Sequence, residues 1–221
     1  MKIGTIDLSP AFALAPMAGM TDTAFRRLVK REGGCGLVVT EMVSSEGLVR
    51  GIDRTLEYAE YTEEERPVSI QIFGGDPDKM AAAAQIVEGM GADIVDVNMG
   101  CPVPKIAKHN AGCSLMREPE HAASVIRAMT KAVRIPVTVK MRAGWDDSSR
   151  NAPDLARRVQ EAGAAAITEA ACSGSRIRLH PALCFAIFGT GQPIFTSTMS
   201  APSPSTICAA SAIFTGSPPK I

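Results

Sequence analysis

The stretch Glu88-Gly-Met-Gly-Ala-Asp-Ile-Val-Asp-Val-Asn-Met-Gly-Cys-Pro102 joins the end of a helix to a buried strand and then to a polar loop. Its glycines end the preceding amphipathic segment, because glycine adopts the left-handed conformation that stops a helix. The run 93–97 that follows is short and rich in β-branched residues, which is typical of a strand covered on both faces. The stretch therefore predicts a helix, a parallel strand and a functional loop, in that order.

The same unit of helix, stop and strand recurs along the chain. Helices are expected to begin after Asp22, Asp76 and Glu118. Aspartate is typical of the position before a helix, and Asp76 and Glu118 are each followed by a proline, which is common in the first turn. Strands are expected at residues 12–15, 37–40, 67–72, 93–97, 136–141 and 165–168. Strands that alternate with helices predict parallel pairing with right-handed crossovers.

The positions of the unusual residues separate a barrel from an open sheet. Polar and glycine-rich residues follow five successive strands, at 16–19, 41–42, 71, 98–102 and 140–142. An open sheet concentrates its ligand at one switch point, whereas a barrel gathers functional residues at the carboxyl ends of many strands. No Gly-x-Gly-x-x-Gly motif follows the first strand, which disfavours a dinucleotide-binding fold. The sequence predicts an α/β protein of the parallel (β/α)8 TIM-barrel type, incomplete, with about six recognisable strands.

The composition of the chain changes near residue 169. All 23 acidic residues lie at or before Glu169, and residues 170–221 carry three of the 23 basic residues. This tail is rich in Ser, Thr, Pro, Ala and Gly and has neither helical nor strand periodicity. We therefore expect a barrel segment at 1–169 and a low-complexity tail at 170–221. The formal net charge of zero gives no sign of a nucleic-acid partner.

Cysteine usage and apolar patterning restrict the class of protein further. The six cysteines form no Cys-x-x-Cys pair, and the three histidines do not recur beside cysteines at ligand spacing. No apolar run is long enough to span a membrane. We expect a reduced, cytoplasmic protein with no membrane segment and no metal.

Three residues at strand ends are candidates for catalysis or ligand binding. Cys101 stands between Gly100 and Pro102, where it is either a displayed thiol or a small buried apolar residue. Lys140 lies in an apolar strand and needs an anion, either a carboxylate such as Asp96 or Glu41 or a ligand that becomes negative during turnover. Gln71 has an amide that donates and accepts, which suits either a ring with adjacent C=O and N–H groups or a structural hydrogen bond.

Other segments have two interpretations each. The turn at 16–19 is either a contact to a flat hydrophobic ligand or a plain strand-to-helix connection. The basic residues of the first long helix are expected to form a solvated face: Arg26, Arg27, Lys30 and Arg31. Phosphate contact remains open for three residues of the loop beside Cys101: Lys105, Lys108 and His109. Cys35 and Cys113 are expected to be core or loop cysteines.

Six ordered motifs resemble the tRNA-dihydrouridine synthases, closest to the bacterial B-type. They are Leu14-Ala-Pro-Met-Ala-Gly-Met-Thr-Asp22, Val39-Thr-Glu-Met42, Gln71-Ile-Phe-Gly74, Asp96-Val-Asn-Met-Gly-Cys-Pro102, Ala111-Gly-Cys-Ser-Leu-Met116 and Val139-Lys-Met-Arg142. The resemblance implies an FMN-binding TIM barrel that reduces the C5=C6 bond of uridine in tRNA, with NADPH as reductant. It implies an oxidoreductase with tRNA as its partner.

The resemblance also implies roles for single residues. Cys101 would be the proton donor, since a thiol is mostly protonated at neutral pH. FMN would be lined by Pro16, Met17 and Ala18, with Gln71 and Lys140 at its pyrimidine edge. Lys140 would balance the negative charge on the reduced flavin. The contacts expected to the target base are Asn98 and Arg142.

The resemblance stops after Thr168. The family continues with a His-Gly-Arg-Thr-Arg motif, two more strands with an FMN-phosphate site and a helical tRNA-binding domain, whereas this chain continues Glu169-Ala-Ala-Cys-Ser-Gly-Ser175. We hypothesise that residues 170–221 are unrelated to the family, for example through a shifted reading frame; a divergent tail is the rival. An open barrel would expose unpaired edges and apolar inner faces at its first and last strands. The alternatives to the synthase are a non-catalytic barrel remnant and another FMN barrel that acts on a small pyrimidine or enone.

Overall fold

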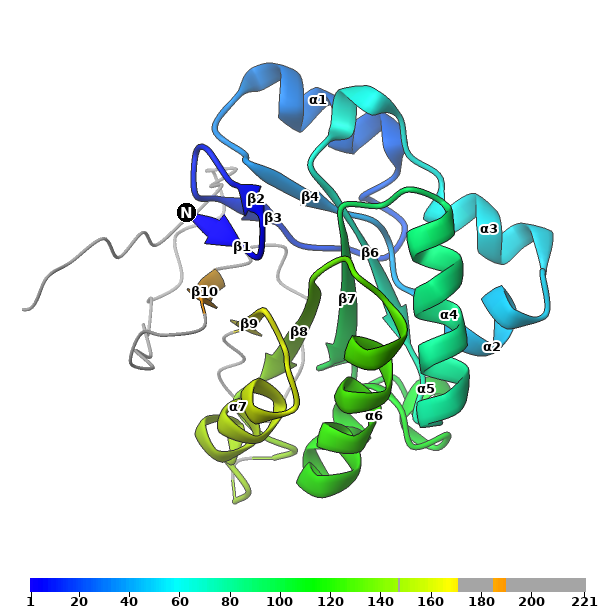
Figure 1. Cartoon of the computed structure of the whole chain (residues 1–221), viewed down its shortest axis with the longest axis vertical. Coiled ribbons are helices and arrows are strands. Elements are labelled where there is room, and N and C mark those ends of the chain that lie inside the picture. The colour runs from blue at the N-terminus through cyan, green and yellow to red at the C-terminus, as the bar shows by residue number, and fades with distance from the viewer. Residues whose placement is uncertain (147, 171–184, 190–221) are drawn as a thin grey trace, which may run out of the picture.

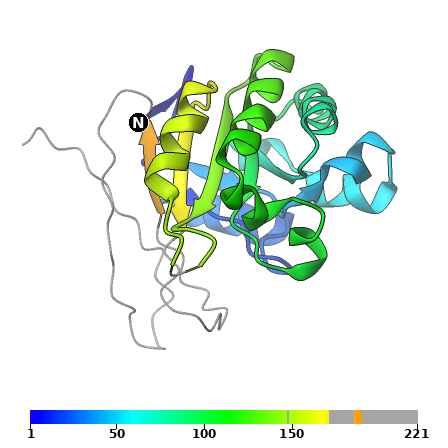
Figure 2. The ribbon, with the colours of Figure 1, turned by 90° about the horizontal axis from the view of Figure 1, so that it is seen from below.

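The computed structural model describes residues 1–146, 148–170 and 185–189 of the 221-residue chain. In this part, six parallel strands form a curved sheet with helices along its outer side (Figures 1 and 2). In their order across the sheet, the strands are β3 (Ala13–Leu14), β4 (Leu37–Val39), β6 (Val68–Phe73), β7 (Ile94–Met99), β8 (Val137–Arg142) and β9 (Ala166–Ala170). A further two-residue strand, β5 (Val43–Ser44), also pairs parallel with β6, beyond the end of β4. The α/β class and the incomplete TIM barrel predicted from the sequence are confirmed.

The helices connect successive strands and pack on the convex side of the sheet (Figure 1). They are α1 (Thr23–Glu32), α2 (Ser45–Val49), α3 (Asp53–Ala59), α4 (Pro77–Gly89), α5 (Pro104–Ala107), α6 (Pro119–Ala132) and α7 (Ala152–Glu161). The side chain of Asp22 caps α1 by accepting from the N–H of Phe25 at 2.8 Å, and Asp76 caps α4. Gly91 follows α4 with φ of +84°, which is the left-handed residue that the sequence predicts there.

Side chains alternate between the two faces of the sheet, as the strand period requires. On β6, Ile70 and Ile72 belong to the apolar core beneath the helices, while Ser69 and Gln71 line a pocket on the concave face. The convex face of each central strand is therefore apolar. The concave face carries the polar groups.

A short hairpin covers part of the concave face. Its strands are β1 (Lys2–Ile3) and β2 (Ile6–Asp7), which pair antiparallel. Ile3 and Leu8 are each 2% exposed and pack in a cluster with Leu37 and Ile94. The sequence predicted no element before residue 12, because two-residue strands leave no periodic signal. The hairpin buries part of the inner face that an open barrel was expected to expose.

The edges of the sheet differ from the prediction at one end. In the described residues β3 pairs with β4 alone, but β9 pairs antiparallel with β10 (Phe185–Gly189) in a register that joins Ala170 to Phe185. The expectation of an unpaired edge at the last strand is therefore wrong, because the backbone of β10 satisfies that edge. The remainder of the expected tail at 170–221, namely 171–184 and 190–221, lies outside the described residues.

Candidate active site

A pocket on the concave face brings together three of the residues predicted for the site. It contains about 410 Å³ of space, part of it open to solvent, and its lining includes Pro16, Gln71 and Lys140. The other predicted site residues are not part of this lining: Met17, Ala18, Asn98, Cys101 and Arg142. Four of these five are connected to the pocket or to its rim by the contacts described below.

A chain of hydrogen bonds runs from the pocket to the loop after β7. The Nε2 of Gln71 donates to Oδ2 of Asp96 at 2.7 Å, and Nδ2 of Asn98 donates to Oε1 of Gln71 at 2.8 Å. The Oδ1 of Asn98 accepts from the backbone N–H groups of Gly100 at 3.1 Å and Cys101 at 2.8 Å. We call these five residues the amide chain. It connects the predicted cofactor edge at Gln71 with the predicted proton donor at Cys101.

Asp96 is a buried carboxylate on which several elements converge. Asp96 lies at the centre of β7 and is 5% exposed. The Oγ1 of Thr138 donates to its Oδ1 at 2.5 Å. Burial raises the pKa of Asp96, while the hydrogen bonds from Thr138 and Gln71 and the ammonium of Lys140 offset this in part. The charge of Lys140 therefore acts on Asp96, one of the two carboxylates expected for it from the sequence. The other, Glu41, accepts from the N–H of Gly19 at 2.9 Å.

The loop that carries Cys101 folds back on the 3-10 helix η2 (Gly112–Arg117). The N–H of Cys113 donates to the carbonyl of Cys101 at 3.0 Å. Gly112 has φ of +59°, and a Cβ there would lie 2.6 Å from the same carbonyl oxygen. Burial raises the pKa of the Cys113 thiol, and the neighbouring guanidinium of Arg142 lowers it in part. Cys101 is half-buried, Cys113 is buried as expected, and Arg142 lies at this loop rather than on the pocket lining.

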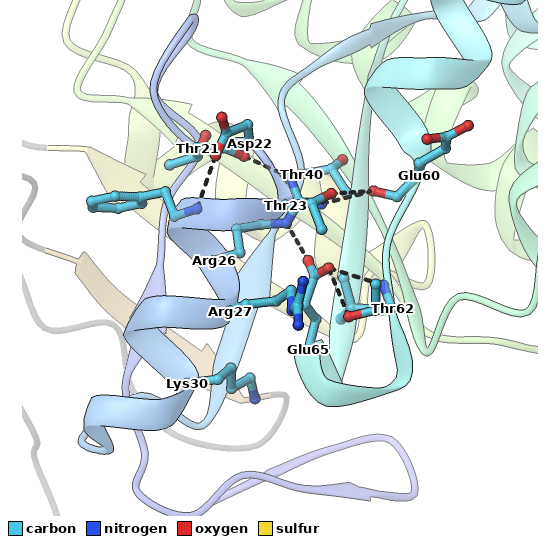
Figure 3. A network of polar contacts seen from close by, with 12 residues as sticks. Thr21, Asp22, Thr23, Arg26, Arg27, Lys30, Thr40, Glu60, Thr62 and Glu65 are labelled. Carbon is cyan, nitrogen blue, oxygen red and sulfur yellow. Dashed lines mark hydrogen bonds and ion pairs between the residues drawn. The ribbon is translucent and has the colours of Figure 1, made fainter.

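The turn after β3 is held by hydrogen bonds at both of its ends. Oγ1 of Thr21 accepts from the N–H of Met17 at 2.9 Å and lies 3.1 Å from the Met17 carbonyl, to which it donates. Ala18 is exposed, and Gly19 is tied to Glu41 as described above. The carbonyl of Thr21 accepts in turn from Arg26 at 2.6 Å (Figure 3). The segment predicted to line FMN is therefore anchored to the first turn of α1.

Arg26 corrects the prediction of a solvated basic face on α1. Its side chain is 2% exposed and its Nε donates to Oε2 of Glu65, which is 0% exposed, at 2.5 Å. The remaining guanidinium nitrogens donate to Thr21, Thr23 and Glu60 (Figure 3). The prediction failed because Glu65, in the 3-10 helix η1 (Glu63–Glu65), stands 39 residues further along the chain.

The neighbouring basic residues of α1 have different surroundings. Arg27 and Arg31 are 36% and 63% exposed and both pair with Glu64, in agreement with a solvated face. Lys30 is half-buried, and its ammonium donates to the backbone carbonyls of Gly36 and Arg66. The basic residues of α1 therefore form contacts within the protein that hold the helix against its neighbours.

Sequence reasoning missed several polar residues of the pocket. Ser69 and Thr138 line it two residues before Gln71 and Lys140, on the same face of their strands, and the strand period could have found them. Thr168 also lines it, as the register partner of Lys140 on the next strand. The Oγ of Ser69 is buried and has no hydrogen-bond partner in the described part of the chain. Buried hydroxyls normally have a partner, so this one suits a bound ligand or water.

The surface beside Cys101 is basic, as the sequence indicated. Lys105, Lys108 and His109 are exposed in and after α5, and phosphate contact there stays a prediction. Among the described residues, no helix is long and apolar enough to cross a membrane, and no group of three or more His, Cys, Asp or Glu side chains could hold a metal ion.

The dihydrouridine synthase (Dus) family model matches residues 13–169, which include every residue of the amide chain and Lys140. The chain belongs to the dihydrouridine synthase family. It is 44% identical over 169 residues to a probable tRNA-dihydrouridine synthase of Rickettsia conorii, covering 76% of this chain and 51% of that protein. It is 43% identical over 167 residues to tRNA-dihydrouridine synthase B of Xanthomonas axonopodis pv. citri, covering 76% and 50%.

A third relative gives the same extent of match. The chain is 49% identical over 158 residues to a probable tRNA-dihydrouridine synthase of Rhizobium leguminosarum bv. phaseoli, covering 70% of this chain and 48% of that protein. This Dus chain therefore spans about half the length of the curated relatives it matches. The recognition of the family from six sequence motifs is confirmed.

Proposed function

We propose that this chain is a flavin-dependent tRNA-dihydrouridine synthase, an oxidoreductase that reduces the C5=C6 bond of uridine in tRNA with FMN as cofactor and NADPH as reductant. The observation that carries the proposal is the amide chain, which connects Gln71 at the pocket with the Cys101 loop. Membership of the Dus family over residues 13–169 supports it. A tRNA substrate would place the protein in the cytoplasm.

The residues of the pocket suit the pyrimidine edge of FMN. That edge carries adjacent carbonyl and N–H groups, and the pocket offers the Gln71 amide, the Lys140 ammonium and the hydroxyl of Ser69, which has no partner among the described residues. Pro16, Met17 and Ala18 would line the ring from the turn after β3. When bound, FMN would supply a hydride to C6 of the uracil ring. Lys140 would hold a positive charge at the edge of the pocket where negative charge develops.

Cys101 would complete the reduction by donating the proton of its thiol to C5. Addition of one hydride and one proton converts uridine to dihydrouridine, so Cys101 must be reprotonated from solvent before the next turnover. The half-buried position of Cys101 is compatible with that exchange. Asn98 and Arg142 would contact the target base near this loop, with Asn98 using hydrogen-bonding capacity beyond its contacts to Gln71 and the loop.

Turnover of the purified 221-residue chain tests this function. The protein is incubated with FMN, NADPH and an unmodified tRNA transcript, and dihydrouridine is measured by mass spectrometry of the digested tRNA. The proposal predicts dihydrouridine that depends on all three additions and is lost in Cys101→Ala, while flavin binding by that variant persists. Bound flavin without dihydrouridine, with reduction of a small pyrimidine or enone instead, would favour another FMN barrel. If the chain binds no flavin and forms no product, the result would favour a non-catalytic barrel remnant.

We also propose that residues 1–169 form the N-terminal part of the FMN barrel and that residues 170–221 are not homologous to the family. The end of the family match at residue 169 supports this division. Translation of the underlying DNA in the other two frames after codon 169 tests the shifted-frame hypothesis. A His-Gly-Arg motif in one of those frames is the expected result. Its absence from both would favour a divergent tail.

A further inference from the structure

The amide chain has a polarity that is fixed at both of its ends. At one end, the carboxylate of Asp96, when ionised, only accepts hydrogen bonds, so Gln71 must present its NH2 group there. At the other end, the backbone N–H groups of Gly100 and Cys101 only donate, so Asn98 must present its carbonyl oxygen. The two amides between these ends therefore turn their NH2 groups toward Asp96 and their oxygens toward the loop.

We propose that Asp96 is a positioning residue: its carboxylate fixes the orientation of the Gln71 amide and, through Asn98, the position of the loop that carries Cys101. The inference deepens the proposed function and rests on it for the roles of Gln71 and Cys101. The hydrogen bonds themselves do not depend on that function. Asp96 would act on the proton donor through two intermediate side chains and without contact to the substrate.

The surrounding sheet makes this arrangement specific. Gln71 on β6 and Thr138 on β8 are the register partners of Asp96 on β7, so the carboxylate is held between two neighbouring strands. Asp96, Gln71 and Asn98 are 5%, 1% and 4% exposed, respectively. Water cannot readily replace a lost partner in such surroundings, so a broken link leaves a buried polar group unpaired.

A plain packing role does not explain a carboxylate at this position. Inner positions of such barrels are usually filled by bulky branched residues, and burial of a charge is costly. Asp96 instead lines the pocket and is acted on by the charge of Lys140. Its two oxygens also have separate partners: Oδ2 accepts from Gln71 in the amide chain, and Oδ1 accepts from Thr138 outside it. Thr138 therefore offers a matched control on the same carboxylate.

Thiol alkylation of Cys101 by iodoacetamide tests the proposal on the flavin-free, full-length chain. The rate is measured by mass spectrometry of the peptide that contains Cys101, with Cys35 as internal reference. Cys35 precedes β4 whereas Cys101 follows β7, so in a parallel sheet the two thiols lie at opposite ends of the strands. The variants are Asp96→Leu, Asp96→Asn and Thr138→Val, each assayed well below its unfolding temperature.

The amide chain predicts different results for these variants. Asp96→Leu removes the acceptor, and the Cys101 rate relative to Cys35 should change by about fivefold or more as the loop loses its fixed position. Asp96→Asn can keep an oxygen toward Gln71 and turn its NH2 group to the Thr138 hydroxyl, so the rate should stay within about twofold of wild type. Thr138→Val leaves the amide chain intact and should also stay within about twofold.

A second variant that interrupts the amide chain keeps the test decisive if Asp96→Leu does not fold. Asn98→Asp retains an oxygen for the loop but sets a second oxygen against Oε1 of Gln71, so it should change the Cys101 rate as Asp96→Leu does. A wild-type rate in either of these two variants, or an equal change in Thr138→Val, would overturn the proposal. The assay contains no flavin, so failure of the chain to bind FMN would contradict the proposed function and leave this result standing. In the flavin-loaded enzyme, Asp96→Leu should lower kcat more than it raises KM for tRNA.

Discussion

Arg26 and Glu65 form an ion pair in which both side chains are removed from solvent, with 2.5 Å between Nε and Oε2 (Figure 3). Glu65 also accepts from the N–H of Thr62 at 2.9 Å, and Arg26 donates to the carbonyl of Thr21 at 2.6 Å. Thr21 holds the backbone of Met17. The pair therefore links the connection before β6 to the turn that is proposed to line FMN.

Removal of one partner of this pair should destabilise the fold strongly. Arg26→Met leaves the Glu65 carboxylate buried without a counter-charge, which is expected to cost about 3–5 kcal/mol. The free energy of unfolding, measured by urea titration with circular dichroism, checks this value. Glu65→Gln tests the other partner in the same way.

The exposed pair on the same helix provides the control. Glu64→Gln removes the partner of Arg27 and Arg31, whose side chains are 36% and 63% exposed. Its urea midpoint should stay close to that of wild type, because solvent already screens these charges. A loss in Arg26→Met no larger than that in Glu64→Gln would contradict the structural importance assigned to the buried pair.

Gly112→Ala should displace the Cys101 loop. The new Cβ would stand 2.6 Å from the Cys101 carbonyl oxygen, and the residue would also be strained at φ of +59°. Gly51→Ala is the matched control, since Gly51 has φ of +64° but open space around its Cβ position. We expect Gly51→Ala to lose about 1–2 kcal/mol from backbone strain and Gly112→Ala to lose more.

Two measurements separate the contact at Gly112 from the strain. Urea titration gives the stability of both variants, and iodoacetamide alkylation gives the reactivity of Cys101. Only Gly112→Ala should change the Cys101 rate. Equal stability losses with unchanged alkylation would show that the close approach to the Cys101 carbonyl has no consequence.

The buried carboxyl of Asp96 predicts a pH dependence of stability with a definite sign. Its pKa in the folded protein is raised above the ordinary value of 3.8, because burial disfavours the charged form. The folded state therefore binds this proton more tightly than the unfolded state. The associated stability is present below the ordinary pKa and is lost as the pH rises through the folded one.

Asp96→Asn removes this titration, so its stability relative to wild type should increase as the pH rises through that window and then level off. Unfolding by urea at a series of pH values measures the difference. Asp146→Asn is the opposite control, since hydrogen bonds from Ser148 and Ser149 lower the pKa of the Asp146 carboxyl. A difference between Asp96→Asn and wild type that does not vary with pH would mean that the Asp96 pKa is not raised in the folded chain.

Lys140→Met should weaken FMN binding and slow turnover. The substitution removes a positive charge from the pocket lining and also takes away the charge that lowers the Asp96 pKa. Loss of one charged hydrogen bond corresponds to about tenfold or more in affinity. Lys131→Met, at an exposed position in the last turn of α6, is the control and should bind FMN as wild type does. Equal FMN affinities of the two variants would exclude Lys140 from the cofactor edge.

The strands and the rim of the site could be predicted because their signals are local. Glycine stops and β-branched runs indicate each strand, and Gln71 and Lys140 stand out as polar residues in apolar strands. The hairpin before residue 12 could not be predicted from strands of two residues. The strand β10 falls in the tail where no element was expected, and its pairing with β9 is a long-range contact.

Long-range partners account for the rest of what the sequence missed. Arg26 looks like one charge among several on an amphipathic helix until Glu65 is brought to it from 39 residues away. The direction in which Gln71 turns its amide depends on the register between β6 and β7, which no local pattern specifies. Cys113 contacts the Cys101 loop only because η2 folds back on it.

Titration of the purified, flavin-free chain with FMN, followed by flavin fluorescence, tests the central claim most directly. The claim is that Gln71 and Lys140 meet the edge of a bound flavin at the pocket connected to Cys101. It predicts saturable binding that Gln71→Leu and Lys140→Met both weaken and that Lys131→Met leaves unchanged. The claim would be contradicted if FMN binding were not saturable, or if Gln71→Leu and Lys140→Met bound FMN with the affinity of wild type.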